Sequence, residues 1–179
     1  GLDHEARAIT RIVEAHGGKV DKSIAWKTRD IPEYKAIWKS RKSAFGAIGR
    51  VSPTFCTQDG VVPRTALPEI LRFMDGASER HGVRIANVFH AGDGNIHPII
   101  MFDERDPDQV KRALRASTEI LEECVRLGGS VTGEHGIGVE KLAMMEKLFT
   151  PQDLDAMKAA RSVFNPENRC SPAKLLPTG

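Results

Sequence analysis

The chain has 179 residues, a length typical of one domain or of one domain with an appendage. Hydrophobic residues make up 40% of it, which is enough for a core, and charged residues make up 28%, which is ordinary for a soluble protein. The net charge of +2, from 26 basic and 24 acidic residues, argues against general affinity for nucleic acid or for an anionic membrane surface.

The cysteines and the apolar runs indicate in which cellular compartment the protein is expected. Cys56, Cys124 and Cys170 are far apart and form no Cys-x-x-Cys pair, so we expect no disulfide framework, no cysteine zinc site and a reducing environment. The longest apolar runs, such as Ile96–Phe102, are too short to cross a bilayer, and residues 1–6 are expected to lie within a helix rather than in a signal segment. We expect a cytoplasmic protein, with peripheral membrane association through an electron-transfer complex left open. Because the chain starts within a helical pattern, we expect it to be a fragment of a longer polypeptide.

Helical periodicity dominates the chain. It predicts helices over residues 2–16, from 32 to a breaker-rich loop at 49–63, from 67 onward, from 106 to the glycines at 128–129, and over 139–148 and 152–164. The tail that follows Asn165 is rich in proline and is expected to be irregular.

Strand patterns are fewer. Val83–His90 and Ile96–Phe102 read as strands, and the turn residues between them predict an antiparallel hairpin that places His90 across from His97. Helices that alternate with so few strands indicate an α+β fold, in which helices cover one face of a small antiparallel sheet.

Two glycine-flanked segments contain three of the six histidines: His90-Ala-Gly-Asp-Gly-Asn-Ile-His97 and Gly133-Glu-His-Gly-Ile-Gly138. Imidazole nitrogens together with a carboxylate oxygen suit Zn²⁺, Mn²⁺ or Fe²⁺. We therefore predict His90, His97 and Glu134 as three ligands of a catalytic metal that keeps an open coordination position. The plain alternative is two surface turns that happen to contain histidine.

Other polar residues of these segments have two readings each. Asp93 is a rival ligand, but a carboxylate in a Gly-Asp-Gly turn more often accepts hydrogen bonds from nearby amides. Asn95 could contact substrate or shape the turn. His135 could remove a proton from a substrate hydroxyl or serve as a structural histidine. Gly133–Gly138 lacks the G-x-G-x-x-G spacing of a phosphate-binding loop, and Gly17-Gly18 has no Lys-Ser/Thr after it, so no dinucleotide-binding module is evident.

These two segments, together with Trp38-Lys-Ser-Arg41-Lys, resemble the C-terminal domain of FAD-linked oxidases in the vanillyl-alcohol oxidase superfamily. The resemblance covers Val20 to Leu176 and is strongest to the D-2-hydroxyacid dehydrogenase branch of glycolate oxidase FAD subunits, D-lactate dehydrogenases and D-2-hydroxyglutarate dehydrogenases. It implies a ferredoxin-like α+β layer followed by helices. It also implies that residues 1–179 form the cap, or substrate, domain, truncated on its N-terminal side, while a separate domain binds most of the FAD.

The resemblance also implies roles for individual residues. His90, His97 and Glu134 would bind a divalent metal, usually zinc, and His135 would be the base. Arg41 would pair with the substrate carboxylate, and Asn165 would contact the flavin. The implied reaction moves a hydride from a 2-hydroxy acid to FAD, and a separate acceptor subunit or protein then takes the electrons.

The implied substrate is small. The loop Pro53–Pro63 looks most like that of the glycolate oxidase subunit, without the lysine expected for a second carboxylate, and Phe45 is apolar. Both features favour glycolate or D-lactate. The chain without its flavin domain is expected to be inactive. A freestanding metal-dependent hydrolase and a non-catalytic metal-binding module remain the alternatives.

Overall fold

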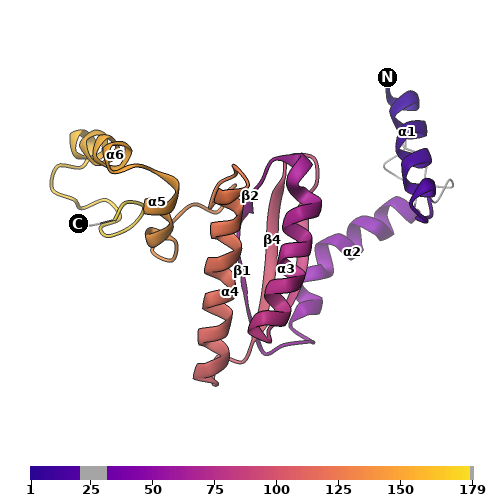
Figure 1. Cartoon of the computed structure of the whole chain (residues 1–179), viewed down its shortest axis with the longest axis horizontal. Helices are drawn as coiled ribbons and strands as arrows, with labels where there is room; N and C mark the ends of the chain where they lie inside the picture. Colours follow the sequence, from indigo (N-terminus) through magenta and orange to yellow (C-terminus); the bar gives the residue numbers. More distant parts are fainter. Residues whose placement is uncertain (21–31, 178–179) are drawn as a thin grey trace. The chain divides into compact units, whose positions relative to one another are not determined.

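The computed structural model describes residues 1–20 and 32–177 (Figure 1). The chain divides into two compact units, Gly1–Ala47 and Ile48–Gly179, and each is described by itself. In the first unit, α1 spans Leu2–Ala15, and α2 begins at Pro32 and ends at Ile48, one residue into the second unit. Both helices were predicted.

The second unit is built on an antiparallel sheet. Its strands are β1 (Thr54–Thr57), β2 (Gly60–Val61), β3 (Arg84–His90) and β4 (Asn95–Phe102). The long strand β4 is central: β3 pairs with one side of it, and β1 and β2 pair one after the other with its opposite side. A single bridge between Val61 and Ser130 extends the sheet beyond β2.

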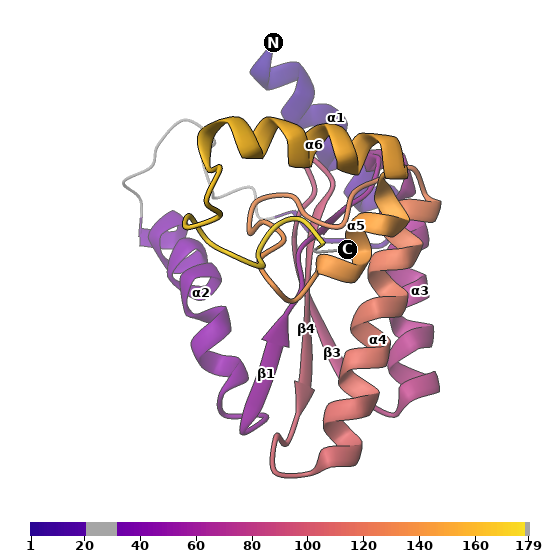
Figure 2. The ribbon, with the colours of Figure 1, turned by 90° about the vertical axis from the view of Figure 1, so that its left-hand side faces the viewer.

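Two long helices complete this layer. α3 (Leu67–His81) follows the 3-10 turn Arg64–Ala66 and packs against β3, and α4 (Pro107–Arg126) packs against β4 (Figure 2). If β1 and β2 count as one interrupted strand and the bridge at Ser130 as the last, the chain order is β-α-β-β-α-β, the ferredoxin-like order. The predicted α+β class is therefore confirmed. None of the helices in the described residues is long and apolar enough to cross a membrane.

The core consists of two apolar clusters. The first lies between the sheet and the two long helices, and its fully buried members are Val62, Ile70, Met74, Ala77, Ile96, Ile100, Ala113, Ala116, Ile120 and Cys124. The second joins the end of α4 to α5 (Leu142–Leu148) and α6 (Pro151–Phe164), and it includes Leu121, Val131, Met145 and Leu154. The segment between α4 and α5 is thus held at both ends by packing.

Two predictions about elements were wrong. The loop at 49–63 was expected to have no strand, yet β1 and β2 lie in it. They are short and broken by the polar pair Gln58–Asp59, so they lack a readable alternation. In addition, α5 begins at Leu142 rather than at Val139, because Gly138 has a φ of +57° and the next residues form turns.

The predicted hairpin of β3 and β4 is confirmed, with a different register at its end. His90 pairs with Asn95, and His97 pairs with Val88, so the two histidines are diagonal neighbours rather than directly opposite. Residues that pair directly share a face, so His90, Asn95 and His97 all lie on one face of the sheet. Their neighbour Ile96 points to the opposite face, into the core under α3 and α4.

The hairpin turn depends on a glycine. Gly94 has a φ of +85°, and a Cβ on it would lie 2.0 Å from the carbonyl oxygen of Val62. That close approach allows the Val62 amide to donate a hydrogen bond of 3.1 Å to the Gly94 carbonyl. The turn that joins the two histidine strands is therefore locked onto the chain that follows β2.

We predict that Gly94→Ala lowers the free energy of unfolding by about 1–3 kcal/mol or more, because it adds backbone strain and a clash with Val62. Gly92→Ala in the same turn is the control, since no described atom lies within 4 Å of the Cβ it would add. Urea denaturation of the chain measures both. Equal stability of the two variants would contradict the packing described for Gly94.

Candidate metal centre

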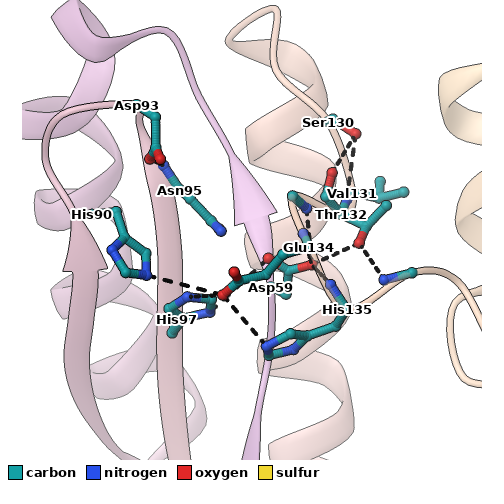
Figure 3. Close-up of polar contacts among 12 residues, drawn as sticks. Asp59, His90, Asp93, Asn95, His97, Ser130, Val131, Thr132, Glu134 and His135 are labelled. Carbon is teal, nitrogen blue, oxygen red and sulfur yellow. Dashed lines mark hydrogen bonds and ion pairs between the residues drawn. The ribbon is translucent and has the colours of Figure 1, made fainter. Parts of the chain in front are cut away.

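Two segments that are distant in sequence meet at one end of the sheet. The first is the end of the hairpin, and the second is the loop Thr132–His135, which the bridge between Val61 and Ser130 holds beside β2. Figure 3 shows the carboxylate of Glu134 directed toward the imidazoles of His90, His97 and His135.

The distances around this carboxylate are short. Glu134 Oε1 lies 2.9 Å from His97 Nε2, 3.9 Å from His90 Nε2 and 3.8 Å from His135 Nε2. One ligand atom each from His90, His97 and Glu134 fall within 4.8 Å of one another. Ligands bonded to one zinc ion lie about 3–3.5 Å apart, because each bond is about 2.0–2.2 Å long. Small inward movements would bring these three atoms to that spacing.

Burial is uneven across the group. The side chain of His97 is 5% exposed, whereas those of His90 and Glu134 are 45% and 53% exposed. Structural zinc sites are closed by four protein ligands, while catalytic sites keep one position open to a small molecule. Three candidate ligands, two of which are about half exposed, match the second arrangement.

His135 joins the same group. Its ring stacks on that of His97, with centroids 5.1 Å apart and planes at 14°, and its side chain is 48% exposed. In an extended strand, Glu134 and His135 would point to opposite faces, but in this tight loop they converge. A half-exposed imidazole thus stands beside the three candidate ligands.

Asp59 is the first of two residues that the sequence analysis missed. Its side chain is fully buried, and its Oδ2 accepts hydrogen bonds from Thr132 Oγ1 (2.6 Å) and from the amides of Gly133 (2.8 Å), Glu134 (3.0 Å) and His135 (2.9 Å). Burial alone would raise the pKa of Asp59, but these four hydrogen bonds outweigh it and bring the pKa down to about 2. The only signal in the sequence is an Asp-Gly pair, which reads as an ordinary turn.

Lys141 was missed as well. It is buried, and its ammonium donates to the carbonyls of Asp59 (2.8 Å) and Val131 (3.0 Å), while it lies 3.9 Å from Asp59 Oδ2. Burial lowers the pKa of Lys141, although the charge of Asp59 opposes that shift. The ammonium therefore joins the Asp59 backbone to the start of the Thr132–His135 loop.

The two remaining polar residues of the hairpin take different places. Asp93 Oδ1 accepts a hydrogen bond of 3.0 Å from the Asn95 amide, which is the turn-forming role we considered more common for it. The Asn95 side chain is buried, and its Oδ1 has no hydrogen-bond partner among the described residues. A Cβ on Gly133 would lie 2.7 Å from Asn95 Nδ2, so a larger residue at this position would displace the Asn95 side chain.

Two predicted site residues lie in other parts of the chain. Arg41 is in α2 and belongs to the unit Gly1–Ala47, so its role stays a prediction. Asn165 ends α6, where its side-chain amide donates to the carbonyl of Cys170 and accepts from the amide of Cys170, each at 3.1 Å. Its contact with a flavin also stays a prediction.

Comparison with known proteins adds a family and several relatives. The family described as "FAD linked oxidases, C-terminal domain" matches residues 2–175. Glycolate oxidase subunit GlcD of Escherichia coli (strain K12) is 43% identical over 150 residues, which are 84% of this chain and 30% of that protein. GlcD of Bacillus subtilis (strain 168) is 36% identical over 78% of this chain and 30% of its own length.

A more distant relative matches nearly the whole chain. The mitochondrial D-lactate dehydrogenase [cytochrome] of Arabidopsis thaliana is 29% identical over 99% of this chain and 32% of its own length. The chain therefore spans about a third of the length of these curated relatives.

Proposed function

Because the chain belongs to the C-terminal domain family of FAD-linked oxidases, we propose that it is the substrate- and metal-binding part of a flavin-dependent 2-hydroxyacid oxidoreductase. The proposed reaction converts glycolate or D-lactate to the 2-oxo acid. Relatives named as glycolate oxidase subunits and a D-lactate dehydrogenase support this choice. The observation that carries the proposal is the convergence of two imidazoles and a carboxylate around a half-exposed position.

The residues present fit a divalent cation. His90, His97 and Glu134 would hold it, because their donor atoms are of the kind that zinc, manganese or iron accept and lie within reach of one ion. When bound there, such an ion supplies Lewis-acid polarisation of a substrate oxygen. The hydroxyl and one carboxylate oxygen of a small acid would approach this ion from the half-exposed side of the group, where His90 and Glu134 lie.

His135 is the proposed base. Its ring is held against His97 by stacking and reaches to within 3.8 Å of the Glu134 carboxylate, so it borders the place proposed for the substrate hydroxyl. Imidazole is suited to accept a proton near neutral pH. His135 would take the hydroxyl proton, and Asn95, buried beside His90, would contribute an amide to orient the substrate.

The remaining roles are binding of the substrate carboxylate and acceptance of the electrons that leave the substrate. Arg41 would pair with the substrate carboxylate, since a guanidinium fork matches two carboxylate oxygens. When bound, FAD would supply the acceptor for the hydride of the substrate carbon. A flavin-binding domain would hold most of the FAD, and Asn165 would contact it. An acceptor subunit or protein is proposed to take the electrons onward, and Phe45 and the loop Pro53–Pro63 favour a monocarboxylate as the substrate.

We predict that His97→Ala weakens zinc binding by more than about 100-fold, since it removes a buried ligand. His81→Ala is the control: like His97, His81 is a largely buried histidine that lies beside a glutamate, Glu119, but it lies at the end of α3. Isothermal titration of the chain with zinc chloride measures both variants. The ligand assignment fails if His97→Ala binds zinc as tightly as the parent.

His135→Ala should retain zinc but slow flavin reduction by glycolate or D-lactate about 10²–10⁴-fold in the full-length protein, because it removes the proposed base. Bleaching of the flavin absorbance after rapid mixing reports the rate, and elemental analysis reports the zinc. If this variant loses zinc to the same degree as His97→Ala, His135 is a ligand and not the base.

Arg41→Lys should raise KM for the 2-hydroxy acid about tenfold in the full-length protein, because lysine cannot make the bidentate pair with a carboxylate. The neighbouring exchange Lys42→Arg alters a basic side chain of the same helix and should leave KM unchanged. Steady-state kinetics with glycolate and D-lactate test the pair. An unaltered KM in Arg41→Lys would remove Arg41 from the site.

A further inference from the structure

We propose that Asp59 is the positioning residue of this centre, with one oxygen holding the loop that carries Glu134 and His135 and the other orienting the imidazole of His97. This inference rests on the metal-binding function proposed above and assigns the group that makes its geometry possible. It gives a role to a buried carboxylate that is remote in sequence from both histidine segments.

The position of Asp59 suits this task. It lies in the break between β1 and β2, where Thr57 pairs with Ile99 of β4 and Gly60 pairs with Ile96. The break is therefore level with the stretch of β4 that contains His97. Regular pairing stops there, and the side chain of Asp59 enters the space between His97 and the loop Thr132–His135, as Figure 3 shows.

The first oxygen, Oδ2, organises the loop. It accepts from one hydroxyl and three successive amides, those of Gly133, Glu134 and His135, at 2.8–3.0 Å for the amides. Three consecutive amides that donate to one oxygen leave the backbone of this loop little freedom. Asp59 therefore determines the direction in which the Glu134 side chain leaves the loop. Hydrogen bonds to an ionised acceptor are about twice as strong as neutral ones.

The second oxygen, Oδ1, faces His97. It lies 4.0 Å from His97 Nδ1, and within the described part of the chain both atoms are buried without a hydrogen-bond partner. Buried polar atoms are rarely left without a partner. These two atoms face each other, and a decrease of about 1 Å in their separation would form a hydrogen bond between them. The bond would place the proton on Nδ1 and leave Nε2 with its lone pair.

That tautomer is the one a metal ligand needs. His97 Nε2 lies 2.9 Å from Glu134 Oε1, the oxygen that is also 3.9 Å from His90 Nε2. A histidine that binds a metal through one nitrogen commonly donates its other N–H to a carboxylate, which fixes the ring and the tautomer. Asp59 would thus orient both His97 and Glu134 for binding the metal.

A direct ligand role for Asp59 is the competing reading, since Asp59, His97 and His135 also have ligand atoms within 4.8 Å. In that arrangement, His97 would bind the metal through Nδ1, and Nε2 would be left facing Glu134. Asp59 is also fully buried, whereas a substrate must enter from the half-exposed side, where His90 and Glu134 lie. The observations therefore favour the positioning role.

The sharpest test is Asp59→Asn in the chain. The amide oxygen can still accept from the loop, but the NH₂ group then faces His97 Nδ1 and requires a lone pair there, which moves the ring proton to Nε2. We expect zinc affinity to fall about 10–100-fold, the size usual for such outer carboxylates. The matched control Ser52→Ala removes a buried donor to the Thr54 and Phe102 carbonyls, at the far end of the β1–β4 pair, and should leave zinc affinity unchanged.

A second measurement needs no metal. In Asp59→Ala the amides of Gly133, Glu134 and His135 lose their acceptor, so their hydrogen exchange should accelerate at least tenfold relative to the parent, with little change in Asp59→Asn or Ser52→Ala. Nuclear magnetic resonance follows the three amides, and circular dichroism confirms that each variant is folded. If Asp59→Ala does not fold, comparison of Asp59→Asn with the parent still decides through zinc affinity.

The outcomes separate the two proposals. Zinc binding by Asp59→Asn equal to that of the parent overturns the positioning of His97, as does a nitrogen spectrum that shows zinc bound to His97 Nδ1. Unchanged exchange in folded Asp59→Ala overturns the control of the loop. If the parent itself binds no zinc, the proposed metal centre fails, while accelerated exchange in Asp59→Ala still supports the role of Asp59 in holding the loop.

Discussion

Burying the carboxylate of Asp59 is the constraint on which the arrangement of this site depends. A carboxylate removed from water is costly unless several donors replace its hydration. Here the hydroxyl of Thr132 and the amides of Gly133, Glu134 and His135 supply those donors. The loop has few other acceptors for three successive amides. The carboxylate therefore offsets the desolvation of the amides, and the amides offset the desolvation of the carboxylate.

The rest of the second unit serves to bring these two groups together. Lys141 donates to the carbonyls of Asp59 and Val131, and so it joins the break in the edge strands to the start of the loop. The bridge between Val61 and Ser130 holds the same segments one residue further along. The apolar clusters pack α4 against β4, and close packing restricts the relative movement of these elements. The half-exposed side chains of the site are therefore attached to closely packed elements.

The parts that sequence reasoning reached are those determined by local patterns. The hairpin follows from two strand-like runs around a Gly-Asp-Gly turn. The histidines and Glu134 lie in short glycine-flanked segments, whose residue types indicate metal binding without knowledge of the fold. The long helix α4 follows from its apolar periodicity and from its capping residue, Asp106, which accepts from the amides of Asp108 and Gln109. In each case the information lies within a few residues.

What the sequence did not reveal depends on contacts between remote residues. Asp59 is 73–76 residues away from the donors it binds, and in the sequence it stands in a breaker-rich stretch beside a glycine. Likewise, Lys141 reads as a surface lysine at a helix start until its two acceptors are placed beside it. The register that makes His90 and His97 diagonal neighbours needs the length of the turn, not only its composition.

The uneven burial of the site has a chemical consequence. The side chain of His97 is buried, while about half of the side-chain surface of each of His90, Glu134 and His135 is exposed. Ligands anchored on rigid strands can fix a cation, whereas a base on the exposed rim can reach a substrate that enters from outside. Under the function proposed above, the chain would supply orientation and charge, and the flavin expected for a FAD-linked family would supply the electron transfer.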